Sequence, residues 1–314
     1  MNLQTKIPLK KQSKNQIDYN SNVLLFGSCF SENIGKKLDY FKFQNLQNPF
    51  GILFHPKAIE TLISNAVGNK IYSEGDVFLN NEQWHCYDAH SKLSNTSKNH
   101  LINQLNEQID LTSSKLKRAS HIIITLGTAW VYRDIKTDSI VANCHKVPQK
   151  LFKKELLSVQ EITNSLKNIL SLIRSVNNDV LVVFTVSPIR HTKDGFVQNT
   201  QSKAHLITAI HQVINNQSFY FPSFEIMMDE LRDYRFYNED MIHPNQVAIN
   251  YIWDKFKTVW ISDESFKVME EVDTIQKGLK HKPFNLKSQA HQKFLQNLEA
   301  KKNQIHSHFP HIVF

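Results

Sequence analysis

The stretch that decides the fold is Asn22-Val23-Leu24-Leu25-Phe26-Gly27-Ser28-Cys29-Phe30-Ser31. An apolar run of β type that breaks at a glycine and continues with helical spacing predicts a strand, a tight turn and a helix start. Such a turn exposes a nucleophile in α/β enzymes, because the strand fixes its position and the helix offers free N–H groups to a developing anion. Ser28 and Cys29 are both candidate nucleophiles. A buried Ser-Cys pair at a strand end is the alternative interpretation.

Further strands and helices are predicted along the chain. Short apolar runs predict buried parallel strands at 23–26, 121–126 and 180–186, with a weaker candidate at 219–221. Apolar periodicity predicts helices at 154–175, 199–216 and 246–260. Strands that alternate with helices imply an α/β fold, a parallel sheet covered on both faces, with ligands at the carboxyl ends of the strands.

The length of 314 residues and the hydrophobic fraction of 41% fit one α/β core with insertions. The polar stretch 74–99 is expected to be an irregular insertion or a hairpin. From residue 263 the composition shifts to lysine, glutamine and asparagine on helical spacing. We therefore expect a core domain at 1–262 and a C-terminal helical extension at 263–314.

Composition argues against several functional classes. The net charge is +8, but the lysines are dispersed, so no nucleic-acid partner is expected. Cys29, Cys86 and Cys144 are too scattered for a disulfide framework, and without a CxxC pair we expect no metal and no cofactor. No secretory signal and no apolar stretch of about 18 residues is present, so we expect no membrane span and a cytoplasmic protein with Cys29 as a free thiol.

A second motif, Asp240-Met241-Ile242-His243-Pro244-Asn245, supplies a candidate base and its orienting acid. In a loop, this spacing lets the Asp240 carboxylate hold Nδ1–H of His243 while Nε2 faces a nucleophile. The imidazole would act first as a base and then as an acid toward the leaving group. The alternative is a turn that leads into the helix at 246–260.

The sequence resembles the GSCFA family in several ordered segments of roughly the first 260 residues. These segments are 27–31, 48–51, 126–130, 186–191 and 240–245. The family looks like a branch of the SGNH (GDSL-type) hydrolase superfamily. The resemblance therefore implies a flavodoxin-like three-layer α/β/α sandwich that hydrolyses or transfers ester-linked acyl groups, carried by a small molecule or a glycan.

The superfamily pattern Phe-Gly-Asp-Ser, laid on residues 26–29, puts the nucleophile on Cys29 and puts Ser28 where an aspartate usually stands. The other register, with Ser28 as nucleophile, requires a slip of one residue. A thiolate is the better nucleophile near neutral pH if a helix N-terminus or an imidazolium lowers its pKa. The helix start after Cys29 is expected to supply the first of these.

The resemblance also implies an oxyanion hole, in which Gly51 is the expected glycine. Ala129 stands where the superfamily has an asparagine, so Thr128, next to Gly127, or Asn48 is expected to replace that donor. Arg190 and His191 follow the third strand and suit a carboxylate or phosphate on the ligand, although a surface salt bridge is the alternative. Ser202 and Lys203 belong to the resemblance without a role that we can derive.

Two hypotheses follow from these residues. The first is an SGNH-like hydrolase or acyltransferase, acting on esters or thioesters, that uses Cys29 or Ser28 with His243 and Asp240. The second is a ligand-binding module that has lost competent chemistry, since Ala129 and Ser28 both depart from the superfamily pattern. An acyl-transfer step in surface polysaccharide assembly is a third, less favoured class.

Overall fold

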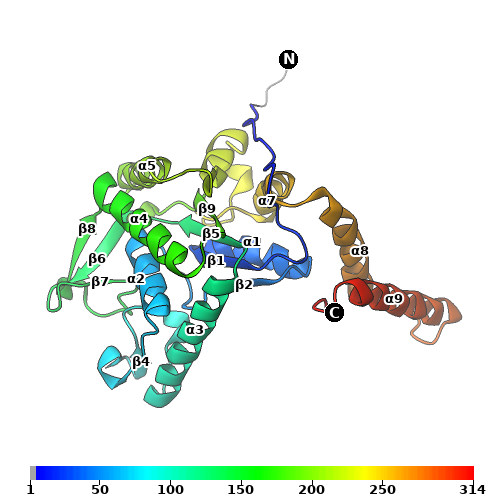
Figure 1. The fold of residues 1–314 in the computed structure, drawn as a ribbon, viewed down its shortest axis with the longest axis horizontal. Coiled ribbons are helices and arrows are strands. Elements are labelled where there is room, and N and C mark those ends of the chain that lie inside the picture. The colour runs from blue at the N-terminus through cyan, green and yellow to red at the C-terminus, as the bar shows by residue number, and fades with distance from the viewer. Residues whose placement is uncertain (1–4) are drawn as a thin grey trace.

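A computed structural model describes residues 5–314, and its centre is a sheet of five parallel strands (Figure 1). The strands are β1 (Val23–Gly27), β2 (Asn45–Gln47), β5 (His121–Leu126), β9 (Leu181–Val186) and β10 (Ser218–Phe221). They lie in the order β10-β9-β5-β1-β2. Counted along the chain, this is the 2-1-3-4-5 order of flavodoxin-like doubly wound sheets, whose topological switch point lies between β1 and β5.

Helices cover both faces of the sheet, which makes the core a three-layer α/β/α sandwich. One apolar cluster joins the sheet to α2 (Pro56–Val67), α3 (Lys98–Arg118), α4 (Val159–Val176) and α5 (Phe196–His211). The other joins it to α1 (Cys29–Tyr40), α7 (Gln246–Trp260) and α8 (Asp263–Lys280). Side chains of β1 alternate between the two clusters, with Leu24 and Phe26 in the first and Val23 and Leu25 in the second. The α/β fold expected from the sequence is therefore confirmed.

The structure corrects the ends of two predicted helices. Residues 154–156 belong to β8 (Phe152–Leu156), and α4 begins only after Ser158, whose side chain forms a capping box with Glu161. Helix α5 begins at Phe196 and ends at His211, three residues before its predicted start and five before its predicted end. Helix α7 has the predicted bounds. Strand β8 pairs with β6 (Trp130–Asp134), which also pairs with β7 (Ile140–Val141), in a small sheet that the sequence did not predict.

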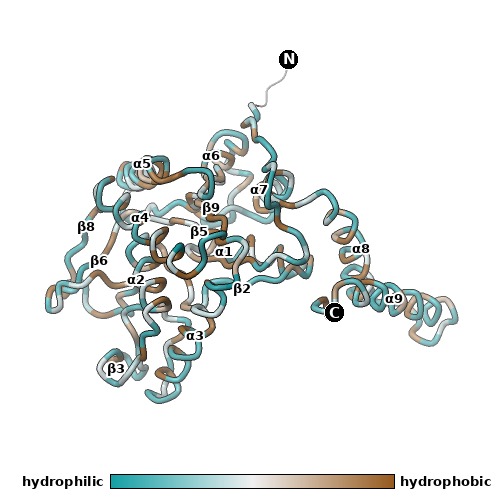
Figure 2. The backbone as a smooth tube through the Cα atoms, viewed as in Figure 1, coloured by the Kyte–Doolittle hydropathy of each residue, from teal (hydrophilic) through white to brown (hydrophobic). Residues whose placement is uncertain are grey.

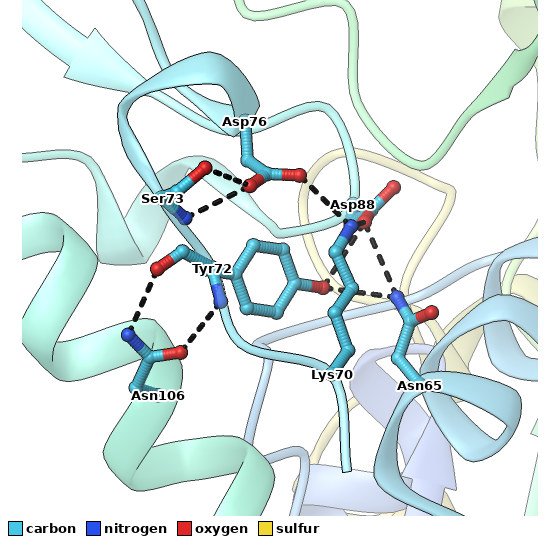
Figure 3. A network of polar contacts seen from close by, with 7 residues as sticks. All are labelled: Asn65, Lys70, Tyr72, Ser73, Asp76, Asp88 and Asn106. Carbon is cyan, nitrogen blue, oxygen red and sulfur yellow. Dashed lines mark hydrogen bonds and ion pairs between the residues drawn. The ribbon is translucent and has the colours of Figure 1, made fainter. Parts of the chain in front are cut away.

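The polar stretch 74–99 contains the expected hairpin, formed by β3 (Phe78–Asn80) and β4 (Gln83–His85). A network of polar contacts holds the chain on both sides of this hairpin together (Figure 3). Asp88 accepts hydrogen bonds from Lys70 Nζ at 3.3 Å, Tyr72 OH at 3.0 Å and Asn65 Nδ2 at 3.3 Å. Lys70 also pairs with Asp76 at 3.0 Å. This network fixes the segment that leads to His90 against the C-terminal end of α2.

A groove of about 860 Å³ lies beside this network, between α2 and α4, and its lining includes Asn65, Lys70 and Asp88. None of the site residues predicted from the sequence lines it.

The C-terminal residues form α8 and α9 (Gln289–His308), and α9 projects away from the sheet (Figure 1). Hydrophilic residues predominate along α9 (Figure 2), while Leu298 and Ile305 are buried. The helical nature of this extension is confirmed, and the domain boundary at residue 262 stays a prediction. No helix among residues 5–314 combines the length and the hydropathy needed to cross a membrane.

Gly27 ends β1 in a backbone conformation that side chains rarely adopt, with φ of +128°. It pairs with Thr125 across the sheet, and a Cβ on Gly27 would lie 2.0 Å from the Thr125 carbonyl oxygen. The chain can therefore turn from β1 into α1 at this point only because residue 27 has no side chain.

We predict that Gly27→Ala lowers the free energy of unfolding by about 3 kcal/mol or more, since the new Cβ overlaps backbone and the φ value becomes strained. Gly75→Ala is the matched control, because the nearest atom to its Cβ would be Ser73 Oγ at 3.9 Å. Urea unfolding curves measure both variants. Equal stability of the two would contradict the prediction.

Candidate active site

The turns that follow β1, β5 and β9 meet at the carboxyl edge of the sheet, where doubly wound folds bind ligands. Two backbone hydrogen bonds join them: Ser28 N donates to Thr125 O at 3.0 Å, and Ser187 N donates to Leu126 O at 2.8 Å. The predicted site residues of all three turns therefore share one edge of the sheet.

Ser28 and Cys29 have different environments within the first turn. Ser28 is only 1% exposed and is the N-cap of α1, where its Oγ accepts from Phe30 N at 3.3 Å. Cys29 is the first residue of α1, and its free thiol is half-buried. Its backbone N–H is one of those that have no acceptor inside a helix. Of the two candidate nucleophiles, Ser28 is thus engaged in capping and Cys29 is the more accessible.

The pKa of the Cys29 thiol differs from the expectation drawn from the sequence. Burial raises this pKa, and the Glu32 carboxylate raises it further. Its own backbone amide, Lys92 and Lys203 act in the opposite direction, but burial is the largest influence. The expected lowering by the helix N-terminus is therefore present and outweighed. In the folded protein Cys29 is a thiol at neutral pH.

Asn48 lies against the nucleophile turn and holds it by a buried hydrogen bond. Its Oδ1 accepts from Gly27 N at 2.9 Å, and its Nδ2 is buried without a hydrogen-bond partner among residues 5–314. The Gly51 N–H donates to Asn48 O at 2.8 Å, so in this structure it is engaged within its own loop. Asn48 therefore has the free donor in this loop.

Gly127 and Thr128 follow β5, and their amides are also engaged. Both donate to Phe54 O, at 2.7 Å and 3.1 Å. Thr128 Oγ1 accepts from Trp130 N at 3.0 Å and lies 3.1 Å from Ser202 Oγ. These contacts fix the second turn, and they leave neither amide free for a ligand.

Asp240 and His243 form the pair expected from their spacing. His243 Nδ1 lies 2.6 Å from Asp240 Oδ2, and Asp240 Oδ1 accepts from the amides of Ile242 and His243, each at 2.9 Å. These hydrogen bonds from the two amides and the imidazole lower the pKa of Asp240 to about 2. The carboxylate is therefore ionised at neutral pH, and it holds Nδ1 of the ring while Nε2 has no hydrogen-bond partner among residues 5–314.

Arg190 links the turn after β9 to the loop that carries Asp240 and His243. Arg190 N donates to Ile242 O at 3.2 Å, and its Nη1 donates to Met241 O at 3.1 Å. Its guanidinium lies 5.3–5.9 Å from three ring centroids, those of Phe196, Tyr234 and Tyr237. Arg190 also lines a cavity of about 210 Å³ with Met227, Leu231 and Tyr237.

His191 lies between the two halves of the site. A Cβ on Gly127 would lie 3.2 Å from His191 Nε2 and 3.4 Å from Ser28 Cβ, so the imidazole packs beside the nucleophile turn. Its Nε2 is buried and has no partner within residues 5–314. Burial, with Lys203 and His243 nearby, lowers the pKa of His191 to about 3. His191 is therefore a neutral ring near Ser28, and the residue before it, Arg190, is hydrogen-bonded to the loop of Asp240 and His243.

Helix α5 holds this edge of the sheet through polar side chains that sequence reasoning left without a role. Asn199 Oδ1 accepts from His191 N at 2.8 Å, and Ser202 Oγ accepts from Ala129 N at 2.7 Å. Both residues are buried. Their spacing of three, on the face of the helix that also buries Leu206, is the signal in the sequence that identifies them.

His90 also belongs to this region, although the sequence placed it only in an insertion. Its ring centroid lies 6.4 Å from that of Phe54, which in turn lies 5.9 Å from that of His191. His90 Cβ would be 2.5 Å from a Cβ on Gly51, whose φ is +73°. The glycine thus lets the insertion approach the site closely. No group of three or more His, Cys, Asp or Glu within residues 5–314 is arranged to hold a metal ion.

The sheet order and the residues at its switch point define an α/β protein of the doubly wound class with a candidate nucleophile–imidazole site. Comparison with protein families is more specific. The chain belongs to the GSCFA family, whose model matches residues 22–256, and the C-terminal domain of GSCFA domain proteins matches residues 272–314. A comparison with curated proteins gave no match.

Solved structures with distant similarity include three esterases. A carbohydrate esterase family 3 protein from Talaromyces cellulolyticus is 10% identical, covering 81% of this chain and 99% of its own, with a TM-score of 0.37. A mutant acetyl esterase with an acetate ion is 9% identical, covering 80% and 99%, with a TM-score of 0.37. An acetyl xylan esterase from the rumen bacterium Butyrivibrio proteoclasticus is 9% identical, covering 88% and 66%, with a TM-score of 0.40. These TM-scores are low, and the fold assignment rests on the sheet and helices described above.

We predict that His191 makes the protein less stable in acid. Its folded pKa of about 3 is lower than the ordinary imidazole value of about 6.5, so between these values the unfolded chain binds a proton that the folded protein does not. The free energy of unfolding therefore falls as the pH drops through this window, by up to about 1.4 kcal/mol per pH unit for this one group.

His191→Gln should reduce this fall, measured by urea unfolding at several pH values between 6.5 and 4. His281→Gln is the control, because His281 is exposed. The same pH dependence in wild type and His191→Gln would contradict the prediction. Buried His55 and His145, whose pKa values are lowered to about 4, are expected to contribute to the remaining fall, as are His90 and His121, whose pKa values burial also lowers.

Proposed function

We propose that this protein is an SGNH-like hydrolase or acyltransferase that acts on ester-linked acyl groups, with Cys29 as nucleophile and the His243–Asp240 pair as base. The observation that supports it best is the 2.6 Å contact between His243 Nδ1 and Asp240 Oδ2, which leaves Nε2 free to accept a proton. Hydrogen bonds from Arg190 attach this loop to the edge of the sheet that carries Cys29.

In the proposed reaction, His243 Nε2 accepts the proton of the Cys29 thiol, and Sγ attacks the acyl carbonyl carbon. The tetrahedral intermediate collapses as the imidazolium returns the proton to the leaving alcohol, which leaves a thioester on Cys29. Water or another acceptor then attacks this thioester, again with His243 as base. Asp240 stays ionised throughout and stabilises the imidazolium.

The oxyanion of the intermediate needs donors that are not already engaged. Asn48 Nδ2 is buried without a hydrogen-bond partner among residues 5–314, and the Cys29 amide stands at the first position of α1. Both groups flank the nucleophile turn, since Asn48 Oδ1 is bonded to Gly27 N. Asn48 is therefore proposed to take the role of the superfamily asparagine, at whose position this chain has Ala129. Gly51, Gly127 and Thr128 would support the turn rather than donate to the ligand.

The substrate class is proposed from Arg190 and its cavity. The guanidinium is held in place by a backbone carbonyl and three aromatic rings, and its pairing with a carboxylate or phosphate would be bidentate. Phe196 and Tyr234 are exposed, and such rings also suit the apolar faces of sugars or an acyl chain. A small-molecule or glycan ester that carries an anionic group fits this combination.

We predict that His243→Ala lowers the rate of hydrolysis of p-nitrophenyl acetate or an acetyl thioester by about 10²–10⁴-fold, because the thiol then lacks its base. Asp240→Asn should lower the rate as well, since the ring loses the carboxylate that orients it. The exposed His281→Gln variant is the control. A wild-type rate in His243→Ala would exclude this mechanism.

Cys29→Ala and Ser28→Ala distinguish the two candidate nucleophiles. Cys29→Ala should abolish the acyl-enzyme adduct seen by mass spectrometry of protein trapped with substrate. Ser28→Ala should still form the adduct and lose about 1 kcal/mol of stability, since it removes the cap of α1. The reverse pattern would assign the nucleophile to Ser28.

A binding module without chemistry is the second candidate function, and the engaged amides of Gly51, Gly127 and Thr128 favour it. Iodoacetamide labelling at neutral pH discriminates the two. Burial raises the pKa of Cys86 to about 12 and that of Cys144 to about 11, so a catalytic Cys29 should be labelled fastest. Equal, slow labelling of all three cysteines would favour the binding module.

A further inference from the structure

Lys203 is a buried amine directly beneath the candidate site. It lies on α5 and is 1% exposed, and its Nζ donates to Gly127 O at 2.7 Å and to Ser187 O at 2.8 Å. These two carbonyls belong to the turns after β5 and β9. Gly127 in turn packs against Ser28 and His191. Lys203 thus ties these two turns together, and the turn after β5 lies next to the nucleophile turn.

The charge of Lys203 has no carboxylate partner, since no ion pair in the part of the chain that the structure describes includes it. Burial lowers the pKa of Lys203 to about 7, and the nearby charge that opposes this effect is the Cys29 thiolate. A buried cation without a counter-ion costs several kcal/mol, and an apolar side chain of similar size would avoid that cost. An unpaired buried amine in a candidate active site therefore calls for a functional explanation.

The electrostatic effect is reciprocal, because Lys203 also lowers the pKa of Cys29. The other charges that face Cys29 are Glu32 on its own helix and Lys92, and these two pair with each other at 2.7 Å. The Lys92 side chain is 56% exposed, so solvent screens it. The neutral ring of His191 is the other titratable group close to Lys203. Among these groups, Lys203 is the buried, unscreened cation.

We propose that Lys203 is a positioning residue whose buried ammonium stabilises the Cys29 thiolate, in addition to joining the turns after β5 and β9. This inference rests on the proposed role of Cys29. When the thiol reacts, the S–H bond breaks, the electron pair stays on Sγ, and the proton goes to His243 Nε2. Lys203 Nζ keeps its protons and supplies the compensating charge, which is worth more in a buried site than in water.

The first test is the pH dependence of Cys29 alkylation by iodoacetamide, which consumes the thiolate and releases iodide. Lys203→Gln keeps a side chain with two N–H donors for the two carbonyls but removes the charge. We expect its Cys29 alkylation rate at pH 7 to fall about tenfold, with the midpoint of the profile moved to higher pH. Lys92→Gln is the matched control, and its rate should fall less than about threefold, because the charge that it removes is exposed.

A purely structural role for Lys203 predicts a different result. If the amine only joined the two turns, Lys203→Gln would leave the midpoint of the alkylation profile where it is in Lys92→Gln. That outcome would overturn the inference. Circular dichroism and the urea midpoint show whether each variant is folded before its alkylation is compared.

A second measurement avoids substitution of Lys203. In protein labelled with ¹³C at the lysine ε-carbons, Lys203 is the lysine whose signal titrates at the lowest pH. Cys29→Asp places a carboxylate near the position of the sulfur, so the titration midpoint of Lys203 should lie about half a unit or more above its midpoint in Cys29→Ala, which has no charge there. Identical midpoints in the two proteins would overturn the inference even if no Lys203 variant folds.

These experiments separate the inference from the proposed function. Alkylation and lysine titration report the coupling between Lys203 and Cys29 whether or not the protein cleaves esters. An acyl adduct on Cys29 together with an unchanged profile in Lys203→Gln would leave the proposed function intact and refute the role of Lys203. A shifted profile without any acyl adduct would support the role of Lys203 and refute the proposed function.

Discussion

The close approach of β1 and β5 at Gly27 is the constraint on which the site depends. These strands flank the switch point of the sheet, where the connections leave toward opposite faces. At Gly27 the backbone comes so near the Thr125 carbonyl that no Cβ fits. The chain must turn there without a side chain, which places Ser28 as the cap of α1 and Cys29 at its first position. The location of the candidate nucleophile is therefore set by backbone packing.

The buried and the exposed titratable groups of the site differ in their charge. Beneath the edge of the sheet, burial raises the pKa of Cys29 and lowers those of His191 and Lys203, so each group is driven toward its neutral form. Asp240 lies nearly half exposed, and hydrogen bonds keep it ionised. The permanent charge of Asp240 thus lies at the rim, while burial disfavours an isolated charge on the groups near the nucleophile. In the proposed reaction, a proton that leaves the buried thiol for the rim creates the charge that Lys203 would balance.

The sequence predicted β1, β5 and β9 well because these strands are buried on both faces, whereas β2, whose residues are only partly buried, was not predicted. Residues 23–27 and 121–126 are buried throughout, and a continuous apolar run is what such a strand requires. The predicted helix at 154–175 began too early because its apolar periodicity extends into β8, and only the Ser158–Glu161 capping box marks the true start.

The pairing of Asp240 with His243 could be predicted, since the two residues lie three positions apart in one loop. The engagement of the Gly51 and Thr128 amides was not, because their acceptors are backbone carbonyls that no sequence motif reveals. Lys203 was left without a role because lysine on a helix usually faces solvent.

The serine that precedes Cys29 fits a thiol nucleophile better than an aspartate would. In the superfamily pattern that the sequence resembles, an aspartate stands at the position of Ser28. A carboxylate there would cap α1 equally well, but its charge beside the sulfur would raise the thiol pKa further. The Ser28 hydroxyl caps the helix without adding that charge. Burial already opposes ionisation of Cys29, so an uncharged cap and a buried cation at Lys203 both act in the direction that a thiolate needs. A serine nucleophile, which stays uncharged until attack, would gain much less from either feature, and this difference favours Cys29 over Ser28.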